Sequence, residues 1–171
     1  LSEKAMLVKL TISQWTARKH DKELSNEIAT IHHTASDVGR YNKILIAQDK
    51  IKEIQKVSNE ARTFHYSNTL PWTDEGGRIL PAKNYLKYTN EIRNIKSRFE
   101  EQVNYFCNVY PALIDDARLR LNGMFKAQDY PAQHKIRDLY DMNTTIDPLP
   151  TCDDFRVKLQ TEELDQIRQD I

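Results

Sequence analysis

Hydrophobic and polar residues alternate near the start of the chain. Over residues 5–12 every second position is apolar, at Met6, Val8, Leu10 and Ile12, which is the period of a strand with one buried face. A second strand pattern occurs at residues 155–159, and a third, weaker one at residues 144–149. Because a two-stranded ribbon is marginally stable alone, we expect these segments to form one small sheet of two or three strands that joins the chain ends.

Between these segments the apolar residues recur with the period of a helix. A first helix is indicated from Leu24 through Ile31 to Ala35 or Val38, before Gly39 interrupts the pattern, and a long one is predicted from Tyr41 to about Tyr66. A second long helix is predicted after Pro81, a residue suited to the first turn of a helix. Its apolar stripe consists of Tyr85, Tyr88, Ile92, Ile95, Phe99, Val103, Phe106 and Tyr110.

Two prolines divide the residues that follow this stripe. Pro111 is expected to end the second long helix or to begin another that carries Leu113 and Leu121, and Pro131 is expected to begin a shorter helix. The amphipathic spacing of residues 161–171 still continues at the last residue. We therefore expect the chain to be the N-terminal part of a longer protein.

These elements predict a single elongated domain over residues 1–171, mainly α with a small sheet (α+β). Helices of about 25 residues are about 40 Å long, which exceeds the diameter of a domain of this size. Residues 41–110 are therefore predicted to form a projecting antiparallel helical hairpin. An exposed hairpin leaves part of its apolar face uncovered, which favours a homo-oligomer or the docking of another segment.

The segment that joins the two long helices, residues 65–81, is long for a connection within a compact domain. It contains Trp72 directly after Pro71, and the pair Gly76-Gly77. Two interpretations stay open. The segment either packs over the end of the hairpin with Trp72 as its plug, or it presents Trp72 to a partner with the glycines as a hinge.

The composition fits a few long regular elements, because Gly and Pro number only 4 and 6 in 171 residues. No apolar run approaches the roughly 18 residues of a membrane span, and no secretory signal pattern is present. The two cysteines, Cys107 and Cys152, form no CxxC motif. We expect a cytoplasmic protein without a membrane segment.

The motifs of nucleotide-binding, hydrolytic and calcium-binding sites are absent from the sequence. His32 and His33 are adjacent, so on a helix they point in different directions and cannot ligate one metal as an i, i+4 pair does. The carboxylate pairs at residues 115–116 and 153–154 are of a kind that metal sites for phosphoryl transfer use, but adjacent carboxylates are commoner near helix N-termini, and the pair at 115–116 fits that role after Pro111. Cys107 fits a packed position on the stripe. We expect no enzyme activity, no metal and no cofactor.

Charge is balanced in total but not along the chain. Residues 1–100 hold 17 Lys or Arg and 12 Asp or Glu, whereas residues 101–171 hold 8 and 13. Basic residues interleaved with aromatic ones are typical of proteins that hold single-stranded nucleic acid. We expect phosphate contacts from Arg18, Lys19, Lys43, Lys50, Lys56 and Arg62, and base stacking on Tyr66 and Trp72.

Two other interpretations compete with nucleic-acid binding. Asp49, Glu53 and Glu60 stand among the lysines, so the basic residues also fit an ordinary solvated face. The protein is alternatively an oligomeric assembly or adaptor protein whose helical hairpin and Trp72 loop dock a protein partner.

Three short motifs carry a family resemblance: Thr69-Leu-Pro-Trp72, Arg78-Ile-Leu-Pro81 and Asp154-Phe-Arg-Val157. With the sequence around them, from Met6 to Ile171, they resemble a family of uncharacterised helical proteins of tailed phages and prophages. The resemblance implies a phage-encoded protein in the cytoplasm of a bacterial host. It implies no catalytic residues.

Overall fold

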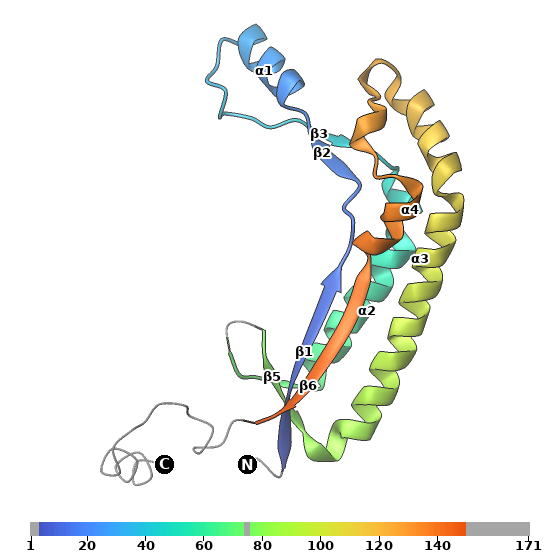
Figure 1. Ribbon diagram of the computed structural model, residues 1–171. Coiled ribbons are helices and arrows are strands. Elements are labelled where there is room, and N and C mark those ends of the chain that lie inside the picture. The colour runs from blue at the N-terminus through green and yellow to red at the C-terminus, as the bar shows by residue number, and fades with distance from the viewer. Residues whose placement is uncertain (1–3, 74–75, 150–171) are drawn as a thin grey trace.

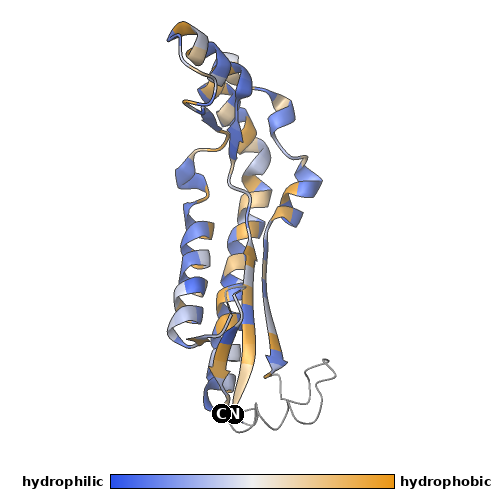
Figure 2. Ribbon diagram, turned by 90° about the vertical axis from the view of Figure 1, so that its left-hand side faces the viewer, coloured by the Kyte–Doolittle hydropathy of each residue, from blue (hydrophilic) through white to orange (hydrophobic). Residues whose placement is uncertain are grey.

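The computed structural model describes residues 4–73 and 76–149. The protein is an elongated crescent built along one curved helix, α3 (Tyr85–Leu121), of 37 residues. α3 buries a single apolar stripe, and in Figure 2 hydrophobic residues gather on the strands and on one side of the long helices. The buried positions are Tyr88, Ile92, Ile95, Phe99, Val103, Phe106, Tyr110, Leu113 and Ala117. The predicted stripe is confirmed, apart from Tyr85, whose side chain is exposed.

A four-stranded antiparallel sheet packs against this stripe. Its order is β4 (Leu70–Pro71), β5 (Arg78–Pro81), β1 (Ala5–Ser13) and β6 (Asp141–Pro148). β6 pairs with β1 from Met6 to Ser13, whereas β5 reaches only as far as Val8. Among the described residues, the edge of β1 beyond Val8 therefore has no strand beside it on the β5 side.

The sheet confirms part of the prediction. The strands predicted at residues 5–12 and 144–149 correspond to β1 and β6, and the mixed fold with a small antiparallel sheet is confirmed. The third predicted strand, residues 155–159, lies outside the described residues. β4 and β5 come from the segment predicted as the connection between the two long helices, residues 65–81.

The first long helix is shorter than predicted. α2 spans Lys52–Ser67, and residues Asn42–Ile44 instead form strand β3, which pairs with β2 (Arg18–His20). Leu45 and Ile46 are both fully buried although they are neighbours, and consecutive residues of a surface helix point in different directions. The predicted helical hairpin over residues 41–110 is therefore wrong before α2 begins, and its two helices, α2 and α3, differ in length.

Pro111 does not end the second long helix, because α3 continues through it to Leu121. Proline lacks the N–H that would bond to the carbonyl of Cys107. The apolar stripe is buried on both sides of that position, at Tyr110 and Leu113, and this burial stabilises the helix there. The short helix predicted after Pro131 is confirmed as α4 (Gln133–Ile136).

The β2–β3 ribbon and α1 (Lys22–Ile31) extend from one end of the crescent (Figure 1). Lys43 of β3 anchors them. Its side chain is 2% exposed, and its Nζ lies 3.0 Å from Asp21 and 2.7 Å from Asp129. Asp21 is also the N-cap of α1, where it accepts a hydrogen bond from the Leu24 amide. This amide and the Lys43 ammonium lower the pKa of Asp21.

We expect Lys43→Met to lower the free energy of unfolding by about 2 kcal/mol, because it leaves two largely buried carboxylates without their cation. Lys50→Met is the matched control, since Lys50 is half exposed and pairs only with the neighbouring Asp49. It should change the free energy of unfolding by less than about 0.5 kcal/mol. Urea unfolding followed by circular dichroism measures both. Equal small losses would show that the buried ion pairs do not hold the ribbon in place.

Candidate nucleic-acid interface

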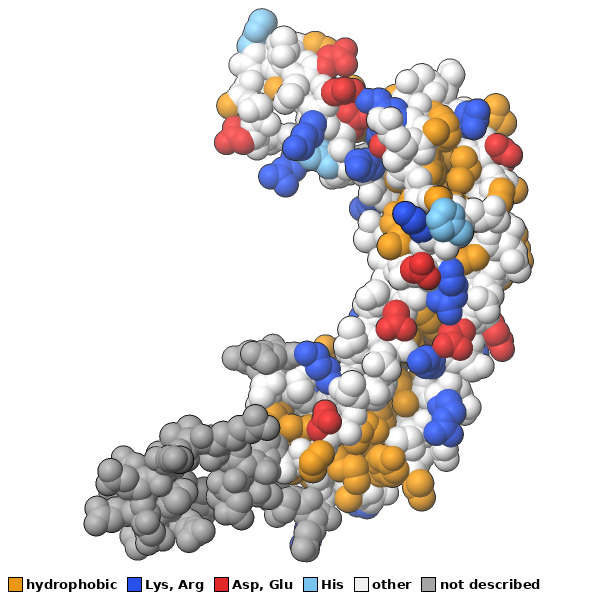
Figure 3. All heavy atoms as spheres, in the orientation of Figure 1, with side chains coloured by type: hydrophobic (Ala, Val, Ile, Leu, Met, Phe, Trp, Pro, Cys, Tyr) orange, Lys and Arg blue, Asp and Glu red, His pale blue; other side chains and the backbone are white. Residues whose placement is uncertain are grey.

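The eight residues predicted to contact nucleic acid do not lie on one face. Arg62 and Tyr66 lie on the second half of α2, and Trp72 follows β4 directly. Arg18 and Lys19 lie on β2, toward the other end of the crescent. Figure 3 shows one side of the molecule hollowed between these ends, with Lys and Arg side chains on both borders of the hollow. The structure thus separates two basic groups.

The first group surrounds a pocket of about 330 Å³ between α2 and the open edge of β1. Arg62 and Tyr66 line it from α2, where a spacing of four residues places them on the same face. Lys9 lines it from β1. We call Lys9, Arg62, Tyr66, Trp72 and Arg78 the aromatic–basic site.

Tyr66 is the exposed platform of this site, since the residue is 58% exposed. The guanidinium of Arg78 lies over its ring, 4.7 Å from the centroid, in cation–π geometry. Arg78 is itself held in place, because its Nε donates to Thr69 Oγ1 at 2.6 Å and a terminal nitrogen donates to the Thr69 carbonyl at 3.0 Å. One side of the Tyr66 ring is therefore backed by a fixed cation.

Beneath this platform, His65 fixes the end of α2 on α3. Its buried imidazole Nδ1 lies 2.7 Å from the hydroxyl of Tyr88. The His65 carbonyl accepts a hydrogen bond from Thr69 Oγ1, the oxygen that also receives Arg78. Burial, with a smaller effect from the Arg78 cation, lowers the pKa of His65 to about 4. The ring is therefore neutral near pH 7.

Trp72 lies in the turn between β4 and β5, which Gly76 makes in the left-handed region at φ +88°. Its indole is half exposed, and its Cδ1 would lie 4.0 Å from a Cβ at Gly77. The exposure does not fit a buried plug. It favours the interpretation in which Trp72 is presented outward.

The second basic group, on the ribbon, is mixed in charge. Arg18 and Lys19 are exposed, and Lys19 lines a pocket of about 320 Å³ together with Lys22 and Lys126. The same pocket contains Asp21, Glu23 and Asp129. Lys126 pairs with Glu23, so acidic residues neutralise part of this group.

The three remaining predicted lysines lie in the segment predicted as a helix from Tyr41 to about Tyr66, but only Lys56 is on α2, which begins at Lys52. Lys43 is buried on β3, where its ammonium pairs with two carboxylates. Lys50 lies in a short 3-10 helix beside Asp49, and Lys56 pairs with Glu53. The three lysines therefore do not share one helix face.

Two residues of the aromatic–basic site were not predicted. Lys9 alternates with the buried residues of β1, so its outward position was visible in the strand pattern. Arg78 gave no such signal, because its place over Tyr66 depends on the pairing of β5 with β1.

Within residues 4–73 and 76–149, no group of three or more His, Cys, Asp or Glu side chains is placed to hold a metal ion. Over the same residues, no helix combines the length and the apolarity that crossing a membrane requires. Cys107 is partly buried, and burial raises the pKa of its thiol, which disfavours the reactive thiolate form.

Residues 2–146 match the family described as "Protein of unknown function (DUF3150)". The chain belongs to this family. Neither the curated proteins nor the solved structures contain a match to the DUF3150 chain. The family description names no activity and no source, so the resemblance to phage and prophage proteins stays a prediction.

Acid should destabilise the protein through His65. The unfolded chain takes up this proton near pH 6.5, but the folded chain only near pH 4, so protons favour unfolding in between. We expect the free energy of unfolding to fall by up to about 3 kcal/mol more in the wild type than in His65→Gln between pH 7 and pH 4.

Urea unfolding at a series of pH values measures this difference. His134→Gln, which removes an exposed histidine, is the matched control. An identical acid dependence in the wild type and His65→Gln would contradict a neutral, buried His65.

Proposed function

We propose that this DUF3150 chain binds single-stranded nucleic acid at the aromatic–basic site and has no catalytic activity. The observation that supports this most is the exposed ring of Tyr66, backed by the Arg78 guanidinium and bordered by a pocket that Arg62 and Lys9 line. Sequence-independent binding of single strands requires this combination of cations along the backbone and ring faces for the bases.

In the proposed complex, Arg62 and Lys9 contact phosphates while a base stacks on Tyr66. The Arg78 guanidinium covers one side of this ring, so the base stacks on the other side. Trp72 offers a second platform at the turn between β4 and β5. Arg18 and Lys19 extend the contact toward the ribbon, and the charge of the neighbouring Asp21 and Glu23 weakens their contribution.

A single strand is favoured over a duplex for two reasons. Stacking platforms need unpaired bases, whereas duplex binders rely mainly on a large positive charge. The chain has 25 basic and 25 acidic residues, far from the strongly basic composition of a dedicated duplex binder. A phage origin and a bacterial cytoplasmic location belong to the same proposal and derive from the family resemblance.

Fluorescence anisotropy with labelled oligo-dT at 50 and 200 mM salt tests the proposal. We expect Tyr66→Ala to weaken binding about tenfold, since one base–aromatic stack contributes about 1–3 kcal/mol. Arg62→Ala should weaken binding and reduce the slope of log K against log salt by about 0.7, the value for one phosphate contact on a single strand.

Lys56→Ala is the matched control. Lys56 lies on α2 like Arg62, but it is 73% exposed and pairs with Glu53, and it is absent from the pocket. Its removal should leave affinity and slope close to the wild type. No binding at 50 mM salt, or equal losses for the Lys56 and Arg62 variants, would refute the aromatic–basic site.

A second candidate function is protein docking at the β4–β5 turn, in an assembly or adaptor protein for a phage or host partner. Leu70 and Trp72 are 59% and 50% exposed there, and such neighbouring apolar side chains are typical of binding hot spots.

Leu70→Ser distinguishes the two functions, because it removes an apolar contact without removing a stacking ring. If docking is the function, a partner captured from nuclease-treated bacterial lysate should be lost in this variant. If nucleic-acid binding is the function, the oligo-dT affinity of Leu70→Ser should equal that of the wild type.

A further inference from the structure

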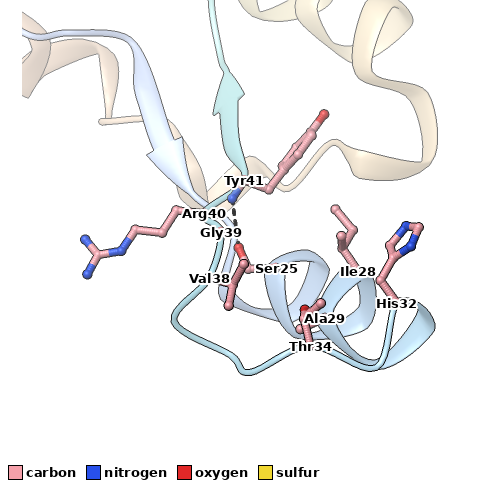
Figure 4. Close-up of a pocket in the computed structure, with 9 residues that line it drawn as sticks. All are labelled: Ser25, Ile28, Ala29, His32, Thr34, Val38, Gly39, Arg40 and Tyr41. Carbon is pink, nitrogen blue, oxygen red and sulfur yellow. Dashed lines mark hydrogen bonds between the residues drawn. The ribbon is translucent and has the colours of Figure 1, made fainter.

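An apolar pocket of about 370 Å³ lies between α1 and the loop after it (Figure 4). Ile28, Ala29 and Val38 line it, and the Tyr41 amide joins the loop to the helix by donating to Ser25 Oγ at 3.0 Å. Nothing in the described residues identifies what would cover this pocket. A larger groove elsewhere in the molecule is more informative, because the edge of a strand borders it.

This groove, which we call the β6 groove, has a volume of about 560 Å³ and lies between α3 and β6. The buried Ile92 of α3 and Met142 of β6 line it, together with Ile146, which is only half-buried. Figure 3 shows hydrophobic side chains gathered at the end of the crescent where α3 begins. The charged residues of the lining are Arg93, Lys96 and Glu100. Long charged side chains cover apolar surface with their stems while their charged ends stay in water.

The edge of β6 beside this groove has no strand next to it among the described residues, where only β1 pairs with β6. On the β5 side of β1, the Lys4 carbonyl accepts a hydrogen bond from the Ala82 amide. Because successive residues of an antiparallel strand bond to opposite neighbours, β1 bonds to β6 through its odd-numbered residues, which stand opposite odd-numbered residues of β6. The N–H and C=O groups of Met142, Thr144 and Ile146 therefore point to the open edge.

The charge around this edge restricts what can pair with it. The exposed face of β6 carries Asp141 and Asp147. A second copy of β6 would bring the same carboxylates together across the edge, and like charges on neighbouring strands are destabilising. A strand with apolar residues on one face and cations on the other fits this edge instead.

Residues 155–159, with the sequence Phe-Arg-Val-Lys-Leu, have this pattern. Their apolar residues alternate with Arg156 and Lys158. Six residues, 149–154, separate them from the end of β6, which is an ordinary length for a connection between neighbouring elements. Leu149 is buried, so the chain still lies against the domain where β6 ends.

We propose that residues 155–159 add to the open edge of β6 as a fifth, antiparallel strand. With Arg156 opposite Asp147, Val157 stands opposite Ile146 and Lys158 opposite Thr145. The apolar side chains then face α3 and fill the β6 groove, and the cations lie on the acidic outer face. The strand pattern of these residues does not by itself assign a neighbour, whereas the groove and its charges do. This placement goes beyond the proposed function and is independent of it.

The open edge of β1 beyond Val8 is the alternative position for such a strand. Lys9 and Arg62 line the pocket beside that edge, and their charges would repel Arg156 and Lys158. Charge therefore favours the edge of β6.

Disulfide cross-linking in the full chain, with Cys107 and Cys152 changed to Ser, tests the placement. Thr145→Cys combined with Lys158→Cys should form an intramolecular disulfide under a mild oxidant. The Cα atoms of such a directly opposed, non-hydrogen-bonded pair are about 4.5 Å apart, within the range of a disulfide. Thr11→Cys combined with Lys158→Cys is the matched control and should stay reduced, because Thr11 is exposed on the same sheet but lies at the open edge of β1. Peptide mass spectrometry identifies the linked residues, and circular dichroism verifies that the variants fold.

Amide hydrogen exchange measured by NMR gives an independent readout. The Ile146 amide points to the open edge, whereas the Thr145 amide bonds to β1, and we expect both to be protected in the wild type. Val157→Pro removes the donor opposite Ile146. It should speed the exchange of the Ile146 amide at least about tenfold and leave the Thr145 amide unchanged.

Three results would overturn the proposal. Cross-linking of residue 158 to position 11 as readily as to position 145 would show that the segment does not select the edge of β6. A disulfide between two chains would show that a second copy supplies the strand. Fast exchange of the Ile146 amide in the wild type would show that this edge stays unpaired.

Discussion

The rest of the structure depends on the need to cover one apolar stripe on a helix of 37 residues. Such a helix is far longer than any other element of the domain, so several separate segments are required to cover it. The sheet and α2 cover its first part, where Phe64 stacks on Tyr88 at 5.5 Å. Trp15, in the segment after β1, contacts the rings of Phe106 and Tyr110 farther along. The elongated shape follows from this linear core.

Elements that are regular over many residues could be predicted from the sequence, and elements defined by pairing could not. The stripe of α3 and the alternation in β1 are local patterns, so their periods reveal them. β3 has only three residues, and its strand character comes from hydrogen bonds to β2. Lys43 was misplaced for the same reason, because its partner Asp129 lies 86 residues away in the chain.

The aromatic–basic site shows the same limit. Arg62 and Tyr66 could be grouped in advance because one helix face carries both. Arg78 joins them only through the sheet, since β5 must pair with β1 before its guanidinium can lie over Tyr66. The hydrogen bonds through Thr69 and His65 then couple the position of this cation to the packing of α2 on α3. The geometry of the candidate binding surface therefore depends on the pairing of the sheet and on the packing of α2 against α3.

The buried Lys43 has a consequence for the evolution of the family. Its ammonium is satisfied by Asp21 and Asp129, which stand at the start of α1 and in the segment after α3. A substitution at one of these three positions leaves a buried charge unmatched unless the others change with it. Positions 21, 43 and 129 are therefore expected to covary among DUF3150 sequences. Their joint presence would identify family members that retain the β2–β3 ribbon and α1 in this position. Their joint loss would identify members that hold these elements by other contacts.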